Sequence, residues 1–352
     1  MITQASVEVP KQAFLNVTEC LLDERIARGK FVDELSKKMA DYLGGGYVLP
    51  VSSGSIADLI SLLVLKEMNP GKTEVVMPAF TFPAQSNAVV LAGLTPHFVD
   101  CGEDFQMNMD YAKEAINDNT LCVFPAHMLG KMSKASVQPF YNKERSVPVL
   151  EDACEAMGGE FNRGVRFGTA GIAGTFSMYA SHIISSGEGG IIFTKDARFY
   201  ELAKSFHDHG KRGSEFDFDY IGINGKMTNM QAAIACALVD KIDDNNKKRR
   251  ENVKYYNEAL GLDFYAEAPH CYPVIYETTV DRMNMLAKLR DNGIECRKLM
   301  ACVPNTPAFR NIKYKGGIYP NSEKFSECGI MVPVHHRLKQ EELEKIVNVL
   351  KS

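Results

Sequence analysis

The sequence predicts an α/β protein with a mostly parallel central sheet and a smaller α+β domain at the C-terminal end. Short and almost continuously apolar segments, such as "EVVMP", "LCVFPAHM" and "GIIFTK", alternate with helical patterns such as "IADLISLLVLKEM". Apolar strands of this kind are typical of sheets that helices cover on both faces. The length of 352 residues exceeds one small core and fits a large domain with a smaller one.

The expected elements follow in a simple order. Residues 10–43 are rich in helical patterns and end at a glycine triplet, and residues 47–51 form a strand before the next helix. Apolar strands with helical patterns between several of them occupy residues 74–195. A long helical pattern begins near residue 230, and its second half is highly charged. We therefore predict a large domain at residues 1–245 and a small α+β domain at residues 246–352.

The composition excludes several classes of protein. The chain has 40 Lys and Arg against 44 Asp and Glu, so it lacks the basic excess of a nucleic-acid binder. The start "MITQASVEVPKQ" has no secretory apolar region, and the run "LISLLVL" is too short to cross a bilayer. Nine cysteines include no CxxC or CxC pair. We expect a cytoplasmic protein without a zinc or iron–sulfur framework.

The turn "SSGS" at residues 52–55 opens a helix and predicts an anion site. Backbone N–H groups and the positive end of the helix dipole meet there, and a phosphate suits both. An ordinary helix N-cap is the alternative interpretation, because serine alone justifies it.

Three further strand ends carry functional side chains. Asp152 follows an apolar strand and can pair with a cationic ring nitrogen, although it also suits a helix N-cap. Phe80 and Phe82 can stack on a flat cofactor or pack in the core. Ser177 offers a phosphate donor. Because ligands gather at the carboxyl ends of parallel strands, these features together predict pyridoxal 5′-phosphate (PLP).

The order of the motifs resembles the DegT/StrS-like family of sugar aminotransferases and dehydratases. The resemblance covers nearly the whole chain and rests on blocks such as "VSSGSIADL", "VVMPAFTFPAQ", "VLEDACEAMGGEF", "GEGGIIFTKD" and "GINGKMTNMQAAIA". It implies the aspartate-aminotransferase fold, the PLP-dependent transferase fold type I.

The resemblance also implies how the cofactor is held. Gly54 and Ser55 at the helix start and Ser177 would bind the phosphate. Phe82 would stack on the pyridine ring, and Asp152 would bind the ring nitrogen.

Further residues have roles that the family implies less directly. Glu155 stands where many of the aminotransferases have glutamine, near the ring hydroxyl. Asn224 would reach the phosphate of the neighbouring subunit, which implies a homodimer, while Lys226 replaces a frequent arginine. Arg297 or Arg337 would meet an amino donor's carboxylate or a diphosphate, or remain solvated surface charges.

His182 decides the chemistry. In the aminotransferases of the family a lysine at this place forms the Schiff base with PLP. The stretch "FSMYASHIISSGEGG" puts His182 there, and no lysine lies between Lys143 and Lys195. Imidazole has no primary amine, so we expect PLP or pyridoxamine phosphate (PMP) to bind without a covalent bond.

A histidine subset of the family is similar to the 3-dehydratases of nucleotide-linked 4-keto-6-deoxy sugars. With an ordinary pKa of about 6.5, His182 would remove a proton from the cofactor's C4′ carbon and assist loss of the C3 hydroxyl. One style of dehydratase binds an iron–sulfur cluster through a Cys-x-Cys pair after the histidine, but only Cys236 lies between residues 182 and 270. We therefore predict a metal-free enzyme that uses glutamate as amino donor.

Two other functions remain open. One is a different PLP reaction on a nucleotide sugar, including transamination, and the other is a non-catalytic protein with the PLP fold. For "HDH" at residues 207–209 we favour a structural or substrate-side role over a metal site. We do not expect His335 and His336 to form a metal pair, and His127 is expected near the cofactor.

Overall fold

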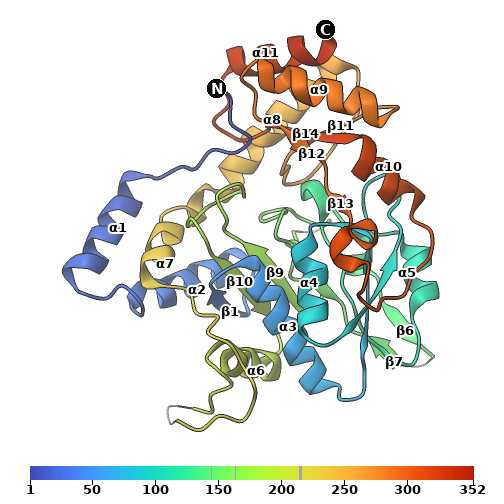
Figure 1. The fold of residues 1–352 in the computed structure, drawn as a ribbon. Helices are drawn as coiled ribbons and strands as arrows, with labels where there is room; N and C mark the ends of the chain where they lie inside the picture. The colour runs from blue at the N-terminus through green and yellow to red at the C-terminus, as the bar shows by residue number, and fades with distance from the viewer. Residues whose placement is uncertain (144, 163, 214–215) are drawn as a thin grey trace.

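A computed structural model describes residues 1–143, 145–162, 164–213 and 216–352 (Figure 1). Its central sheet consists of two hydrogen-bonded groups of strands, joined by parallel bridges from Val123 to Val149 and from Ala126 to Asp152. In order across the sheet, the strands are β1 (Tyr47–Val51), β10 (Gly190–Thr194), β9 (Ala173–Ser177), β8 (Leu150–Asp152), β5 (Thr120–Val123), β2 (Glu74–Pro78) and β4 (Thr95–Val99).

The sheet is mostly parallel, as the sequence predicted. Strand β10 runs antiparallel to both β1 and β9, whereas β8 is parallel to β9, and β2 is parallel to β4 and β5. The register pairs Asp152 with Thr175 and Ser177 with Gly190. The last residues of β8 and β9 therefore lie at one edge of the sheet, next to the first residue of β10.

Helices cover both faces of this sheet (Figure 1). Alternation along β10 shows why, since Ile192 belongs to one apolar core while Ile191 and Phe193 belong to another. The first face is covered by α3 (Gly54–Met68), α4 (Pro83–Leu91) and α6 (Ala197–His207). The second face is covered by α2 (Lys30–Tyr42) and α7 (Asn229–Cys236), with α1 (Lys11–Leu22) packed on α7, while α5 (Met109–Ala115) lies against β4 and β2.

The C-terminal part forms a separate antiparallel sheet with its own helices. The strand order is β11 (Tyr272–Ile275), β14 (Gly329–Val332) and β12 (Arg297–Lys298). The helices are α8 (Ile242–Leu260), α9 (Thr279–Asp291), α10 (Pro320–Cys328) and α11 (Gln340–Lys351). Ile2 pairs with Ile294, so the N-terminal residues lie against this part (Figure 1). The domain boundary at residue 245 stays a prediction.

Short elements complete the described chain. They are β3 (Phe80–Thr81), which pairs with β13 (Ala301–Cys302), the hairpin of β6 (Phe140–Asn142) and β7 (Arg145–Val147), and the 3-10 turns η1 (Met128–Gly130), η2 (Lys134–Val137), η3 (Val239–Lys241), η4 (Val303–Asn305) and η5 (Pro307–Phe309). The long helical pattern predicted from residue 230 is thus two helices, because α7 ends at Cys236 and η3 precedes α8. Neither glycine nor proline marks the break, so it could not be predicted from the residue pattern.

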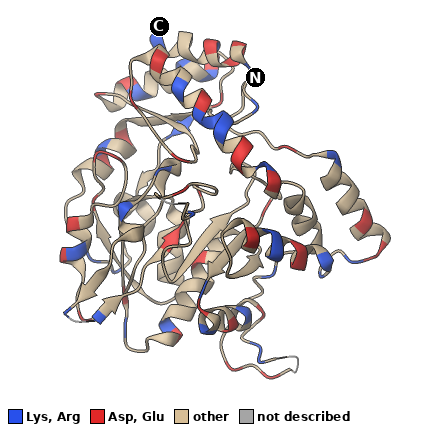
Figure 2. Cartoon of the chain, turned by 180° about the vertical axis from the view of Figure 1, so that it is seen from behind, with Lys and Arg blue, Asp and Glu red and all other residues tan. Residues whose placement is uncertain are grey.

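Charged side chains are concentrated outside the central sheet. Figure 2 shows Lys, Arg, Asp and Glu spread over the outer helices and loops, with few on the strands. Within the described residues, every helix is too short or too polar to cross a membrane.

Asp100 connects the two parts of the molecule, and its removal should destabilise the fold. Its buried carboxylate follows β4 and accepts hydrogen bonds from the N–H groups of Asn321 (3.0 Å) and Ser322 (2.9 Å) at the start of α10, and from the Ser322 hydroxyl (2.5 Å). We expect Asp100→Ala to lower the free energy of unfolding by about 3 kcal/mol, measured by urea denaturation, because buried donors lose a charged acceptor.

Asp110→Ala is the matched control for this prediction. Asp110 lies in the first turn of α5 with its side chain 84% exposed, so we expect a change below about 0.5 kcal/mol. Equal losses in the two variants would show that Asp100 does not connect the parts.

Candidate active site

A cavity of about 500 Å³ lies at the carboxyl ends of β8 and β9. It is bordered by the first residues of α3 and α4 and by β12 of the C-terminal part. The predicted residues that line it are Gly54, Ser55, Phe82, Asp152, Glu155, Ser177, His182 and Arg297. Segments far apart in the sequence therefore meet around one space, as expected for residues at the carboxyl ends of parallel strands.

One end of the cavity has the properties of an anion site. Ser53 is the N-cap of α3, and its hydroxyl accepts a hydrogen bond from the Ile56 N–H at 3.3 Å. The N-cap role that the sequence left open thus belongs to Ser53, while Ser55 and Ser177 line the cavity. The first N–H groups of a helix lack intrahelical partners, so this end combines free amides with two hydroxyls.

Glycines allow three backbone segments to touch at this end. A Cβ atom on Gly54 would lie 2.8 Å from the Cys154 Sγ and 2.9 Å from the Ser177 Cβ. A Cβ atom on Gly190 would lie 2.4 Å from the carbonyl carbon and oxygen of Ser53. The start of α3, the end of β9 and the start of β10 could not approach so closely with larger residues.

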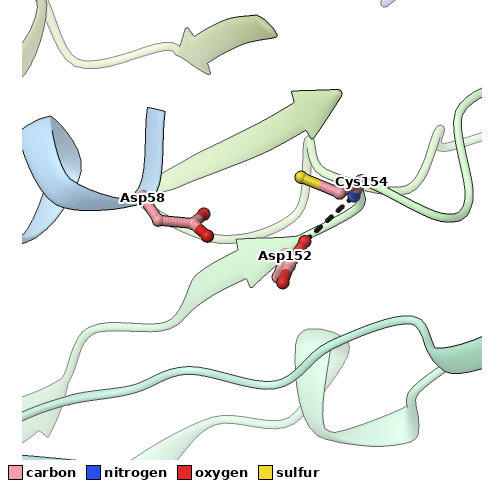
Figure 3. Close-up of side chains that lie close together, drawn as sticks. All are labelled: Asp58, Asp152 and Cys154. Carbon is pink, nitrogen blue, oxygen red and sulfur yellow. Dashed lines mark hydrogen bonds between the residues drawn. The ribbon is translucent and has the colours of Figure 1, made fainter. Parts of the chain in front are cut away.

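Two carboxyl groups and a thiol lie together deeper in the cavity (Figure 3). The Asp152 Oδ1 accepts a hydrogen bond from the Cys154 N–H at 3.0 Å, and the Asp58 Oδ1 accepts one from the Thr175 hydroxyl at 2.6 Å. The ligand atoms of Asp58, Asp152 and Cys154 lie within 4.8 Å of one another. Such groups also suit a metal ion, and the metal-free site therefore stays a prediction.

The two aspartates compete for one negative charge. Burial raises the pKa of Asp152, and it raises the pKa of Asp58 well above the ordinary value, with repulsion from Asp152 adding to the effect. Two adjacent buried carboxyl groups do not readily both ionise. We infer that Asp58 holds a proton, which leaves Asp152 to pair with a cation such as a protonated ring nitrogen.

Glu155 is a third buried acid in the cavity. Its Oε2 accepts a hydrogen bond from the Leu129 N–H at 2.7 Å, and Leu129 has a left-handed backbone with φ of 61°. Burial raises the pKa of Glu155 to about 8. At neutral pH the side chain is therefore mostly protonated and, like glutamine, can donate a hydrogen bond to a ligand oxygen.

His182 lies in the loop between β9 and β10, where the residue is half-buried and its Nδ1 atom is buried. The backbone N–H of His182 donates a hydrogen bond to the Tyr179 carbonyl oxygen at 3.0 Å. The backbone carbonyl oxygen of His182 accepts one from the Arg249 guanidinium at 3.2 Å. Burial and then the Arg249 charge lower the pKa of His182 to about 4. This pKa corrects the ordinary value of about 6.5 expected from the sequence: the imidazole is neutral at neutral pH and free to accept a proton, but it is a weaker base than usual.

His127 and Phe80 serve the structure around the cavity. The His127 Nδ1 accepts a hydrogen bond from the Ser133 N–H at 3.1 Å, so its Nε2 carries the proton toward Glu151, 3.1 Å away. The ring of His127 stacks on Phe167 with centroids 4.3 Å apart. His127 also lines the cavity, as expected, whereas Phe80 is fully buried in the core and Phe82 is 59% exposed.

The other predicted residues lie outside the cavity of this chain. Asn224 forms a backbone bridge with Asp208, and Arg337 donates to the Val7 carbonyl at 3.1 Å. Within "HDH", Asp208 pairs with Lys226 at 2.6 Å and with Arg28 at 2.9 Å, which fits a structural role.

Three important residues escaped the sequence analysis. Asp58 sits among apolar residues in "IADLISLLVL", and a carboxylate in such a run was the signal that could have revealed it. His270, whose ring centroid lies 5.0 Å from that of His182, comes from the loop before β11. Arg249 lies among charged residues in α8, so the sequence pattern did not indicate that it is buried.

The lowered pKa of His182 predicts a specific loss of stability in acid. Because the folded pKa of about 4 lies below the ordinary value of 6.5, the unfolded chain binds more protons, and stability falls as pH drops from 6.5 toward 4. In cofactor-free protein, His182→Gln should remove about 2 kcal/mol of the fall between pH 7 and pH 5. Urea denaturation at both pH values measures it, and equal falls with and without His182 would contradict the prediction.

Known proteins resemble this chain over almost its full length. A model of the DegT/DnrJ/EryC1/StrS aminotransferase family matches residues 8–351. The chain is 30% identical to a GDP-perosamine synthase of Caulobacter vibrioides, covering 95% of this chain and 93% of that protein. It is 26% identical to a GDP-4-keto-6-deoxy-D-mannose 3-dehydratase of Yersinia pseudotuberculosis, covering 96% and 95%.

A solved structure has the same fold. It is a GDP-4-keto-6-deoxymannose-3-dehydratase with a trapped PLP-glutamate geminal diamine, with a TM-score of 0.89 at 24% identity, covering 99% of this chain and all of that one. This likeness confirms the predicted fold type I. Since the family model spans nearly every residue, the chain belongs to the DegT/DnrJ/EryC1/StrS aminotransferase family.

Proposed function

We propose that the protein is a metal-free 3-dehydratase that binds PLP or PMP without a covalent bond and acts on nucleotide-linked 4-keto-6-deoxy sugars. One observation carries this proposal. The cavity presents the imidazole of His182 in the loop where the resemblance places the Schiff-base lysine of the aminotransferases. The dehydratase relative, 26% identical over nearly the whole chain, supports the same reaction.

The residues of the cavity fit the cofactor. Its phosphate would be bound by the start of α3, Ser55 and Ser177. At this place the surrounding atoms leave no room for a Cβ atom on Gly54 or Gly190. Phe82 would cover one face of the ring. When bound, PMP supplies an amine that condenses with a ketone and a protonated ring that takes up electrons.

Two acids would control the ring. Asp152 would accept a charge-assisted hydrogen bond from the protonated ring nitrogen, and its negative charge would keep that nitrogen protonated. Glu155, mostly protonated because its pKa is raised to about 8, would donate to the ring hydroxyl oxygen.

His182 would move the proton that the reaction requires. As a neutral base it would take a proton at the C4′ carbon, and as an imidazolium it would give one to the departing hydroxyl at C3 of the sugar. Burial makes the imidazolium a stronger acid than usual, which favours the second transfer. A nearby anionic phosphate would raise the pKa of His182 from about 4 toward neutrality.

The open side of the cavity offers cations for the substrates. Arg297 and Lys298 of β12 line it and would bind the sugar diphosphate or the carboxylate of glutamate. Glutamate as amino donor is supported by the glutamate adduct in the dehydratase structure of the same fold. We also propose a homodimer, in which Asn224 serves the neighbouring cavity, and a location in the cytoplasm.

Transamination of a nucleotide sugar is the second candidate function. The 30% identity to a GDP-perosamine synthase favours it, and Lys298 supplies a primary amine at the edge of the cavity. This lysine would have to replace the missing amine at position 182.

Reduction with borohydride distinguishes the two ways of holding the cofactor. Wild-type protein loaded with PLP should show no lysine adduct by peptide mass spectrometry, because imidazole forms no imine. His182→Lys is the positive control and should carry the adduct at residue 182. Stoichiometric labelling of Lys298 in the wild type would favour transamination instead.

The reaction itself is tested with a panel of nucleotide-linked 4-keto-6-deoxy sugars, PMP and glutamate. We expect loss of one sugar oxygen, followed by mass spectrometry. His182→Gln should slow this reaction by about 10²–10⁴-fold, the usual contribution of a general acid–base group. His182→Lys should lose most deoxygenation, and an unchanged rate in that variant would remove the proposed role of the imidazole.

A further inference from the structure

A second, much smaller cavity of about 10 Å³ lies on another side of His182. The polar residues that line it are Ser6, Glu8, His182, Ser185, Asn245 and His336. A cavity of about this size, measured with a water-sized probe, holds one water when two to four polar groups surround it. His182 therefore stands between the main cavity and a polar space for one water.

Unpaired polar atoms surround this small cavity. Within the described residues, the Nδ1 atom of His182 and both ring nitrogens of His336 are buried without a hydrogen-bond partner. Leaving such atoms unpaired destabilises the folded protein, whereas a water bridging the two Nδ1 atoms would satisfy both. On its other side, the His336 Nε2 lies 3.3 Å from the Glu8 Oε2, within hydrogen-bond distance but not at a hydrogen-bonding angle in this structure.

We propose that Glu8, His336 and an internal water position the imidazole of His182 and fix its tautomer. In this chain of hydrogen bonds the His182 Nδ1–H donates to the water, the water donates to the His336 Nδ1, and the His336 Nε2–H donates to Glu8. Donors and acceptors match at every link. The arrangement leaves the His182 Nε2 unprotonated, so that it is the nitrogen available as a base. The proposal rests on the proposed function of His182.

The charges around this chain of hydrogen bonds favour neutral imidazole rings over an imidazolium. Burial and then the charge of Arg249 lower the pKa of His336, while Glu8 raises it. Arg249 acts in the same direction on His182, His270 and His335, and Asp152, Glu155 and Glu188 line the main cavity on the other side. Glu8 thus orients His336, and through it His182, without forming an imidazolium.

The N-terminal segment that carries Glu8 is held in place by the "HHR" motif. The His335 Nε2 lies 3.2 Å from the Thr3 carbonyl oxygen, and Arg337 donates to the Val7 carbonyl. The adjacent histidines consequently have different roles, since His335 anchors the segment and only His336 lines the small cavity. On this proposal the "HHR" motif, which does not line the main cavity, holds the N-terminal segment and orients His182.

Nitrogen NMR of the PMP-loaded enzyme tests the proposal directly. Long-range ¹H–¹⁵N spectra of protein labelled in histidine report which nitrogen of His182 carries the proton, with His182→Gln used to assign the signal. We expect the Nδ1–H tautomer in the wild type. In Glu8→Gln and His336→Leu, the Nε2–H tautomer should gain population, and Glu8→Asp should restore the wild-type spectrum.

Turnover supplies a second readout. If about one ring in ten keeps the productive tautomer, kcat should fall about tenfold while KM stays unchanged. His335→Gln is the matched control, because it weakens the anchor of the same segment without lining the cavity, and its His182 spectrum should match the wild type.

The outcomes are decisive in either direction. An unchanged His182 tautomer in Glu8→Gln and His336→Leu, or an equal change in His335→Gln, would overturn the proposal. Should His336→Leu fail to fold, Glu8→Gln still decides, because the Glu8 side chain is 33% exposed and tolerates the substitution. The nitrogen shifts need no substrate, so they separate this inference from a failure of the proposed dehydration.

Discussion

A buried guanidinium holds two loops of the candidate active site against the long helix α8. Arg249 is 1% exposed and donates hydrogen bonds to the carbonyl oxygens of His182 (3.2 Å), Pro269 (3.1 Å) and His270 (3.3 Å). Burial lowers the pKa of Arg249 to about 10, so it is still charged at neutral pH. Carbonyl partners leave that charge unneutralised, and it opposes protonation of the imidazoles nearby. Arg249 therefore helps to position His182 and, after burial, contributes to its lowered pKa.

Burial in this cavity favours the uncharged forms of several side chains that are usually charged. Asp58 and Glu155 are acids whose pKa values burial raises, while burial lowers the pKa of His182 and His270. Such a site carries little charge by itself. A ligand with an anionic phosphate and a cationic ring would supply the missing charges, the first at the start of α3 and the second beside Asp152. Ligand binding and protonation of these residues are thus coupled.

Which site residues could be predicted from the sequence depends on how far apart in the chain the contacting residues lie. Gly54, Asp152 and Ser177 were recognisable because each follows its own strand, and the carboxyl ends of parallel strands meet at one edge. Arg249 and His270 were not, because their effect on His182 arises from packing between segments far apart in the chain. The pKa of His182 was misjudged for the same reason, since burial is a property of the folded protein.

The surroundings of position 182 explain how one family can accommodate two chemistries. Burial and the charge of Arg249 would lower the pKa of a lysine there as they lower that of the imidazole, since both effects oppose any cation. A lysine would then be uncharged and nucleophilic, which is the state needed to form an imine. The same surroundings keep the imidazole uncharged, with a free lone pair, but imidazole cannot form that bond. On the proposed function, the pocket would hold a neutral nitrogen in either case, and the identity of one side chain would decide whether that nitrogen also tethers the cofactor.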